Sequence, residues 1–383
     1  MNYLLNKFDD IRPYNDNEVH EALKKSVDHP IIKALLSFTF PDKDPEEVKE
    51  IVMSCHSIRD FQTKIIYQSV KNIIERTSGG FTYSGFDKLE PNTAYLYISN
   101  HRDIILDTSL LNVALFENNL VMTASAIGDN LVNKPFLLAL SKLNRSFLIR
   151  RQLTPREMLS SSKLISEYIQ NLLFEEDRSV WIAQREGRTK DGNDVTQQGV
   201  LKMLALAKNE ESVMHYFKKL KIVPVSISYE YDPTDVLKMP ELMAKHYDQE
   251  YVKSNNEDFN TILKGATGRK RRMHINAGNI LDVELDQIEN SGEPTNKQFQ
   301  MLADIIDERI HQGYKLWPSK YIAHDILNNT DRFSDKYTEE EKRMFERRIE
   351  RRIDSSNKVM LENFLAMYAN PVSNKLKYDE NKV

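Results

Sequence analysis

Six short apolar runs alternate with helical patterns between residues 81 and 320, and this alternation limits the possible folds more than any other feature. The runs lie at 94–98, 120–124, 146–149, 179–183, 222–228 and 273–277. Apolar side chains at helical spacing fill most intervals, for example at 154–174 and 196–208. The pattern predicts an α/β domain with a mixed, mostly parallel sheet flanked by helices. In such sheets, active sites lie in loops after the carboxyl ends of strands.

Helical patterns without strands lie on both sides of this domain. We divide the chain into an N-terminal helical region (1–78), an α/β domain (79–320) and a C-terminal helical extension (321–383). The polar, irregular sequence at 229–268 predicts an insertion at the protein surface. The pattern at residues 338–369 predicts one long, charged helix. This helix would dock on its own protein, on a second copy or on a membrane surface.

Composition excludes several classes of protein. The formal net charge of −4 over 383 residues gives no reason to expect a nucleic-acid partner. A single cysteine, Cys55, excludes a disulfide within the chain and suits a reducing compartment. The neighbouring His56 has the wrong spacing for a zinc site, and we expect no metal centre. No run approaches the roughly 20 apolar residues of a membrane-spanning helix, and charges interrupt the apolar patch at 1–18, so we expect no signal peptide.

The stretch SNHRDIILD at 99–107 follows the first apolar run and permits two interpretations. The triplet His101-Arg102-Asp103 also begins the catalytic loop of protein kinases. A kinase needs an asparagine five residues after that aspartate, where this chain has Thr108, and a GxGxxG loop, which this chain lacks. The triplet also leads directly into an apolar helical pattern. We therefore reject the kinase interpretation.

The second interpretation is acid–base chemistry on a hydroxyl group. A histidine has the right unperturbed pKa to take the proton of an attacking hydroxyl, and a neighbouring carboxylate fixes its tautomer. Basic residues that can hold a phosphate follow at later strand ends, in RSFLIRR at 145–151 and VWIAQREGRTKDG at 180–192. A fourth block, IVPVSISY, lies at 222–229.

These four blocks resemble the motifs of the glycerolipid acyltransferase family, which are roughly NHxSxxD, GxxFIxR, FPEGTRS and VPVxxxY. That family includes glycerol-3-phosphate and 1-acylglycerol-3-phosphate acyltransferases, and the second and third blocks lean towards the glycerol-3-phosphate branch. The resemblance spans roughly residues 80–320. It implies the glycerolipid acyltransferase fold. It also implies transfer of a fatty acyl chain from acyl-coenzyme A or acyl-carrier protein (acyl-ACP) to a hydroxyl of glycerol 3-phosphate or 1-acylglycerol 3-phosphate in phospholipid synthesis.

The resemblance also implies roles for individual residues. His101 would be the general base and Asp107 its supporting carboxylate. The acceptor-binding residues would be Arg150, Arg151, Glu186, Gly187, Arg188 and Lys190.

The chain departs from the family pattern in each of the first three blocks. The family aspartate lies five residues after its histidine, whereas Asp107 lies six after His101. On a straight helix, six steps place two side chains roughly 240° apart. Either His101 lies in the turn between strand and helix, or the helix contains a π-bulge. Asp103 is an alternative partner for His101, or it caps a helix that begins at Ile104. Arg145 replaces the family glycine, and either Glu186 has moved one place or Arg185 occupies the place of the family glutamate.

The resemblance requires no metal and no cofactor beyond the thioester co-substrate. The expected partners are the thioester donor, the glycerolipid acceptor, acyl carrier protein and a membrane surface, and nucleic acid is not among them. We expect a cytoplasmic protein, free or peripheral on the inner face of the membrane. Two alternatives remain: a family acyltransferase for an amino-acid lipid or a lysophospholipid, and a catalytically inactive relative that binds lipid or ACP. The sequence leaves the oligomeric state open.

Overall fold

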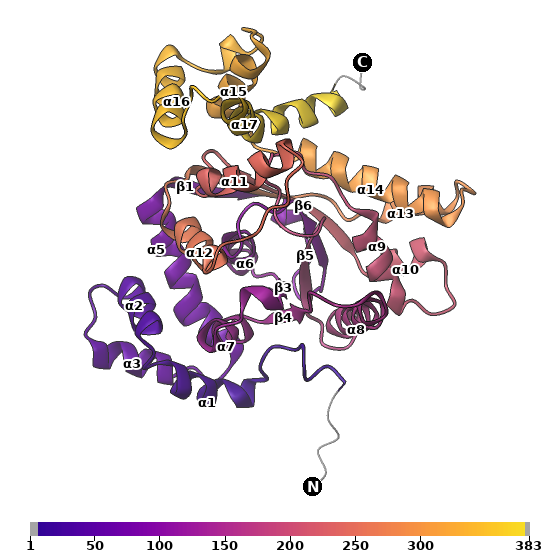
Figure 1. Ribbon diagram of the computed structural model, residues 1–383. Helices are drawn as coiled ribbons and strands as arrows, with labels where there is room; N and C mark the ends of the chain where they lie inside the picture. Colours follow the sequence, from indigo (N-terminus) through magenta and orange to yellow (C-terminus); the bar gives the residue numbers. More distant parts are fainter. Residues whose placement is uncertain (1–6, 380–383) are drawn as a thin grey trace.

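A central seven-stranded sheet organises the computed structural model, which describes residues 7–379 (Figure 1). The strands are β1 (Ser78–Ser84), β2 (Leu96–Ser99), β3 (Thr123–Gly128), β4 (Ser146–Ile149), β5 (Ser179–Ala183), β6 (Ile222–Tyr229) and β7 (Arg271–Ala277). Their order in the sheet is β1-β7-β6-β2-β5-β3-β4. Neighbouring strands are parallel except β6 and β7, which are antiparallel. The predicted α/β class with a mixed, mostly parallel sheet is confirmed.

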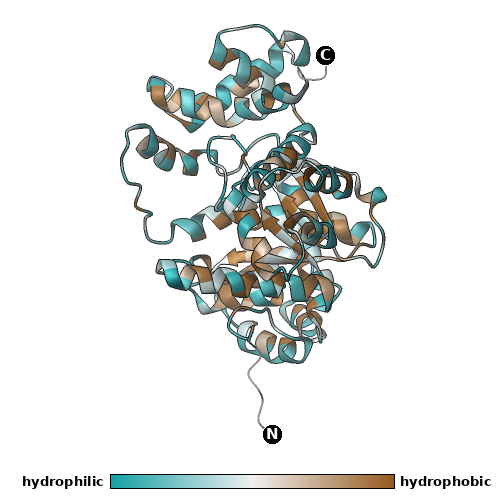
Figure 2. Ribbon diagram, turned by 90° about the vertical axis from the view of Figure 1, so that its right-hand side faces the viewer, coloured by the Kyte–Doolittle hydropathy of each residue, from teal (hydrophilic) through white to brown (hydrophobic). Residues whose placement is uncertain are grey.

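Helices cover both faces of the sheet. One layer contains α5 (Tyr67–Thr77) and α6 (Leu106–Glu117), and the other contains α8 (Pro155–Phe174), α9 (Gln198–Leu204), α10 (Val213–Lys219), α13 (Asp282–Glu289) and α14 (Thr295–Gln312). Alternate residues of β2 enter the two layers: Leu96 and Ile98 pack with the α8 side, and Tyr97 packs with the α6 side. The central strands are therefore apolar on both faces, and Figure 2 shows brown, hydrophobic strands in the middle of the molecule.

The N-terminal region is helical, as predicted, within the described residues. It contains α1 (Asp16–Ser26), α2 (Pro30–Thr39), α3 (Pro45–Met53), α4 (Ile58–Phe61) and a π-helical segment (Gln62–Ile66) that leads into α5. Together with α7 (Pro135–Leu143), these helices enclose a separate apolar core. We expect no signal peptide in residues 1–18, and residues 1–6 of that stretch lie outside the described residues.

The sequence pattern missed β1. The predicted N-terminal helical region ends at residue 78, and the six predicted runs include none at 78–84, yet Ser78 begins a strand that pairs in parallel with β7. Glycines hide the alternation of a strand, and β1 lies at the edge of the sheet, where its side chains are only partly buried.

The predicted surface insertion at 229–268 is wrong. Residues 229–235 are all buried, and the segment then forms α11 (Asp235–His246) and α12 (Glu257–Thr267). Its charged side chains can be buried because they form ion pairs with one another and with the C-terminal helices. These ion pairs offset the cost of removing the charges from water, and the hydropathy of the sequence does not show them.

The C-terminal extension consists of α15 (Pro318–Asn328), α16 (Glu339–Arg352) and α17 (Lys358–Asp379). The prediction of one helix over 338–369 is wrong, because the non-helical residues 353–357 separate two helices, α16 and α17. The proposed boundary at 320/321 falls inside α15. The extension packs on its own chain, because α17 contacts α11. Figure 1 shows the three helices of the extension at the top of the molecule. Among the described helices, none is long and apolar enough to cross a bilayer.

One buried carboxylate attaches the extension to α11. Asp235 is fully buried and accepts from Arg348 Nη2 at 2.5 Å, from Arg352 Nε at 3.0 Å and from the Tyr368 hydroxyl at 2.8 Å. Two guanidinium groups therefore share one carboxylate at this junction.

We predict that Asp235→Asn lowers the free energy of unfolding by about 3 kcal/mol, because it leaves two largely buried guanidinium groups without their counter-ion. The measurement is a urea titration. The matched control is Asp335→Asn, since Asp335 is exposed and, within residues 7–379, forms an ion pair with its neighbour Lys336 alone. Its effect should stay within about 0.5 kcal/mol. Equal losses in the two variants would contradict this account of the junction.

Candidate active site

His101 lies in a loop at the carboxyl end of β2. Residues 100–105 are not helical, and α6 begins at Leu106, not at Ile104. Of the two explanations for the six-residue spacing, the position in the strand-to-helix turn agrees with the structure. The helix that carries Asp107 contains no π-helical segment.

His101 and Asp107 are hydrogen-bonded. The distance from His101 Nδ1 to Asp107 Oδ2 is 2.8 Å. An ionised carboxylate only accepts hydrogen bonds, so Nδ1 carries the proton and Nε2 keeps its lone pair. The His101 side chain is 15% exposed, whereas that of Asp107 is 0% exposed. Among the described residues His101 Nε2 has no hydrogen-bond partner, so it is free to accept a proton from a bound molecule.

Three further donors hold the Asp107 carboxylate. The backbone N–H groups of Arg102 and Asp103 donate to Oδ2 at 2.6 and 3.0 Å. The hydroxyl of Tyr229, at the end of β6, donates to Oδ1 at 2.8 Å. Burial, together with the charge of Asp107, raises the pKa of Tyr229 well above its usual value, so the hydroxyl remains a donor. Both oxygens of the buried carboxylate are therefore satisfied.

Asp103, the alternative partner, is bonded elsewhere. Its Oδ1 accepts from the backbone N–H groups of Ile105 and Leu106 at 3.1 and 2.9 Å, which closes the turn before α6. Its Oδ2 is buried without a hydrogen-bond partner. Burial and the charge of Asp107 raise the pKa of Asp103, while Arg188 opposes this shift.

The blocks that are distant in sequence meet around His101. The side chain of Asn100 donates to Ile227 O at 2.9 Å and accepts from Ile227 N at 2.8 Å, which ties the His101 loop to β6. The backbone N–H of Thr189 donates to His101 O at 2.8 Å, which ties the same loop to the turn after β5. Neither Asn100 nor Tyr229 was assigned a role from the sequence, although both occupy motif positions.

Most of the predicted acceptor-binding residues are held in ion pairs. Arg150 is exposed and pairs with Asp10 at 2.9 Å, on the N-terminal segment. Arg151 pairs with Glu186, so the structure brings the second and third blocks together. Lys190 pairs with Glu241 of α11, and burial lowers its pKa.

Arg188 is the predicted basic residue that remains available. Its Nη1 is buried and has no hydrogen-bond partner. Its charge acts on Asp103, so it lies close to the His101 loop. Gly187 precedes it with φ +69°, a left-handed conformation that few other residues adopt, and is exposed in the turn after β5.

Sequence reasoning also missed Gly265 on α12. A Cβ built at this position would lie well inside contact distance of Asp103 Oδ2, so the glycine allows α12 to approach the His101 loop. The side chain of Asp103 thus fills the space between the loop and α12. Within residues 7–379, no three His, Cys, Asp or Glu side chains are grouped so that they could hold a metal ion.

Comparison with known proteins gives a family match over part of the chain. Residues 80–228, which carry all four blocks, match the family model described as Acyltransferase. Among solved structures, the 1-acyl-sn-glycerophosphate (LPA) acyltransferase PlsC from Thermotoga maritima is similar, at 11% sequence identity and a TM-score of 0.38. That alignment covers 77% of this chain and 91% of PlsC. None of the curated proteins compared with the chain matches it.

We predict that Tyr229→Phe destabilises the protein by about 1.5–3 kcal/mol, because Asp107 Oδ1 loses its donor to a buried charge. Tyr97→Phe is the matched control, since Tyr97 is equally buried and its hydroxyl contacts no carboxylate. It should cost less than about 1 kcal/mol. The free energy of unfolding in urea measures both, and similar values would remove Tyr229 from the support of Asp107.

A second pair of variants tests the approach of α12. Gly265→Ala should destabilise the protein by about 1–3 kcal/mol, because the added methyl group displaces Asp103. Gly199→Ala on α9 should instead stabilise it by about 0.5–1 kcal/mol, since its Cβ would meet open space. Thermal unfolding distinguishes them; a stabilising Gly265→Ala would show that α12 does not press on the loop.

Proposed function

We propose that this protein is an O-acyltransferase that moves a fatty acyl chain from an acyl thioester to a hydroxyl of a phosphate-bearing glycerolipid acceptor. The observation that carries the proposal is the pair of a buried Asp107 and a partly exposed His101 with a free Nε2. The family match over residues 80–228 supports the same class of reaction.

His101 Nε2 would take the proton of the acceptor hydroxyl as its oxygen attacks the thioester carbonyl. The new carbon–oxygen bond forms, the carbon–sulfur bond breaks, and the proton on His101 passes to the departing thiolate. Asp107 would stabilise the imidazolium that exists between these steps. Its own position is already satisfied by three other donors, so little reorganisation is needed when His101 becomes charged.

Arg188 would bind the acceptor phosphate, since its Nη1 has no hydrogen-bond partner among the described residues and its charge acts on Asp103 of the His101 loop. Arg151 and Lys190 could join it only if their carboxylate partners, Glu186 and Glu241, release them. We infer that Glu186 keeps Arg151 in place until an anionic acceptor arrives. Arg150, which is exposed and pairs with the exposed Asp10, is the weakest of the proposed ligands.

We propose acyl-coenzyme A or acyl-ACP as the donor, and glycerol 3-phosphate or 1-acylglycerol 3-phosphate as the acceptor, in phospholipid synthesis at the surface of a membrane. An amino-acid lipid or a lysophospholipid would be the alternative acceptor.

The test is thiol release from each donor across phosphorylated and non-phosphorylated acceptors. We expect acceptor-dependent release that falls by roughly 10²–10⁴-fold in His101→Ala, because the general base is lost. Asp107→Asn should cause a loss of similar order, and Asp103→Asn a smaller one. His215→Ala, which removes an exposed histidine on α10, should retain full activity.

Different outcomes separate the alternatives. A larger loss in Asp103→Asn than in Asp107→Asn would mean that the wrong carboxylate is assigned. Release with non-phosphorylated acceptors alone would remove the phosphate role of Arg188. A folded protein that binds acyl-ACP or lipid, but releases no thiol with any donor and acceptor, would contradict the proposal and indicate a non-catalytic binding protein.

A further inference from the structure

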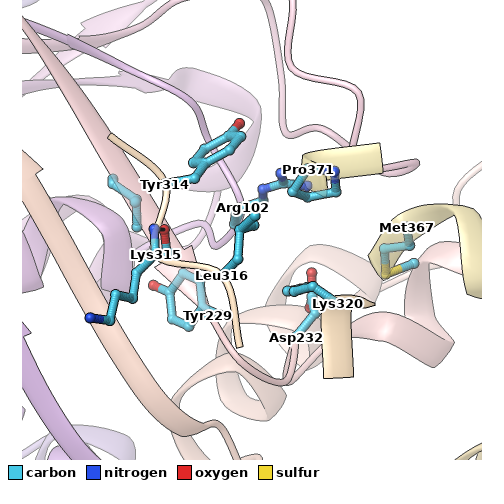
Figure 3. A pocket seen from close by; sticks show the side chains of 11 residues that line it. Arg102, Tyr229, Asp232, Tyr314, Lys315, Leu316, Lys320, Met367 and Pro371 are labelled. Carbon is cyan, nitrogen blue, oxygen red and sulfur yellow. Dashed lines mark hydrogen bonds between the residues drawn. The ribbon is translucent and has the colours of Figure 1, made fainter. Parts of the chain in front are cut away.

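A small cavity lies behind the candidate active site, where the α/β domain meets the C-terminal extension (Figure 3). Its volume is about 20 Å³, and its wall includes Arg102, Tyr229, Asp232, Tyr314, Lys320 and Met367. A space of this size accommodates one water-sized particle, such as a halide ion or a single oxygen atom of a larger anion. His101 does not line the cavity: its Nδ1 binds one oxygen of Asp107, and the hydroxyl of Tyr229, which does line the cavity, binds the other.

Two buried cations meet at this cavity. Lys320 of α15 is 8% exposed and Arg102 is 9% exposed. Arg102 Nη2 donates to Asp194 Oδ2 at 2.5 Å and to Gly192 O at 3.4 Å. Lys320 Nζ makes no hydrogen bond with any described residue and lies 4.3 Å from the centroid of the Tyr368 ring. Lys320 is therefore a buried ammonium group without a carboxylate of its own.

Each carboxylate near the cavity already has a cation. Asp232 pairs with Lys238 and also accepts from the backbone and hydroxyl of Thr234. Glu230 pairs with Arg271 and Arg272. Asp194 pairs with Arg102 and accepts from the hydroxyl of Tyr314. The charges of Asp232 and Glu230 act on Lys320, but among the described residues no carboxylate forms an ion pair with it, so its charge is only partly compensated.

An uncompensated buried charge is unfavourable, so it either loses its proton or acquires a counter-ion. Burial, and next the charge of Arg102, lower the pKa of Lys320 to about 7. Arg102 and Lys320 both line the cavity, so together they would attract an anion. Their remaining N–H groups are the donors that could bind it.

We propose that this cavity binds one small inorganic anion between Arg102 and Lys320. The anion would join the α/β domain to the C-terminal extension, because Arg102 belongs to the His101 loop and Lys320 to α15. It would also support the candidate active site, since the backbone N–H of Arg102 donates to Asp107. The inference about binding does not depend on the proposed acyl transfer.

Lys315 offers a matched control. It also lines the cavity, but its side chain is exposed and, in Figure 3, points away from Arg102 and Lys320. Lys315→Met and Lys320→Met each remove one positive charge from the cavity wall. Only Lys320→Met removes a buried ammonium group.

The experiment is thermal unfolding of the full chain at constant ionic strength, with sodium chloride, bromide or phosphate replacing sodium gluconate. We expect a saturable rise in Tm of about 1–3 °C with the small anions, retained in Lys315→Met and lost in Lys320→Met. A rise with halides and phosphate would indicate a general anion site, and a rise with halides alone would indicate a site for a monatomic ion. Equal Tm values in gluconate and in every small anion would overturn the proposal, as would an unchanged rise in Lys320→Met.

A bromide-soaked crystal gives a second measurement that needs no variant. Anomalous scattering should place a bromide ion within hydrogen-bonding distance of Lys320 Nζ. Bromide at other positions only would overturn the proposal. So would a wild-type stability that rises between about pH 7 and 10 with no dependence on the anion, since Lys320 would then simply be deprotonated in the folded state.

Discussion

The buried carboxylate of Asp107 is the group on which the arrangement of the candidate site depends. Removing a carboxylate from water costs several kcal/mol, and only well-placed donors offset that cost. Here the donors come from three places: the ring of His101, the backbone at Arg102 and Asp103, and the hydroxyl of Tyr229 on β6. The same contacts that make Asp107 tolerable in the interior also fix the tautomer and orientation of His101. Stability and chemistry at this site therefore cannot be separated.

The extra residue between His101 and Asp107 becomes understandable once the loop is seen. Counting residues along a helix separates the two side chains, but His101 is not on the helix, and the loop folds back so that Nδ1 reaches Asp107. The second block is similar. Arg145 adopts φ +59°, a left-handed conformation that suits glycine, which is the residue that the family pattern has there. Arg145 thus adopts a backbone conformation that suits the family glycine, although the residue type differs.

Charged residues inside the molecule connect the candidate site to the C-terminal extension. Lys238 donates to the carbonyl of Arg102 at 3.1 Å and pairs with Asp232, and Asp235 binds two arginines of α16. These residues belong to segments whose polarity predicts a solvent-exposed surface. They can be buried because each carboxylate has a cation from another element. The extension thus backs the loop that carries His101, although no residue of the extension touches His101 itself among the contacts described.

The sequence by itself determined the α/β class, six of the seven strand positions to within a few residues, and His101 with a nearby aspartate, Asp107 or Asp103, as the centre of interest. These features are local, since they depend on the period of apolar residues and on side chains at strand ends. Tertiary structure alone decided that Tyr229 and Asn100 support the pair, that Arg151 and Lys190 are held by glutamates, and that residues 229–235 are buried. Those outcomes depend on which distant charges meet in space, and a linear pattern does not contain that information.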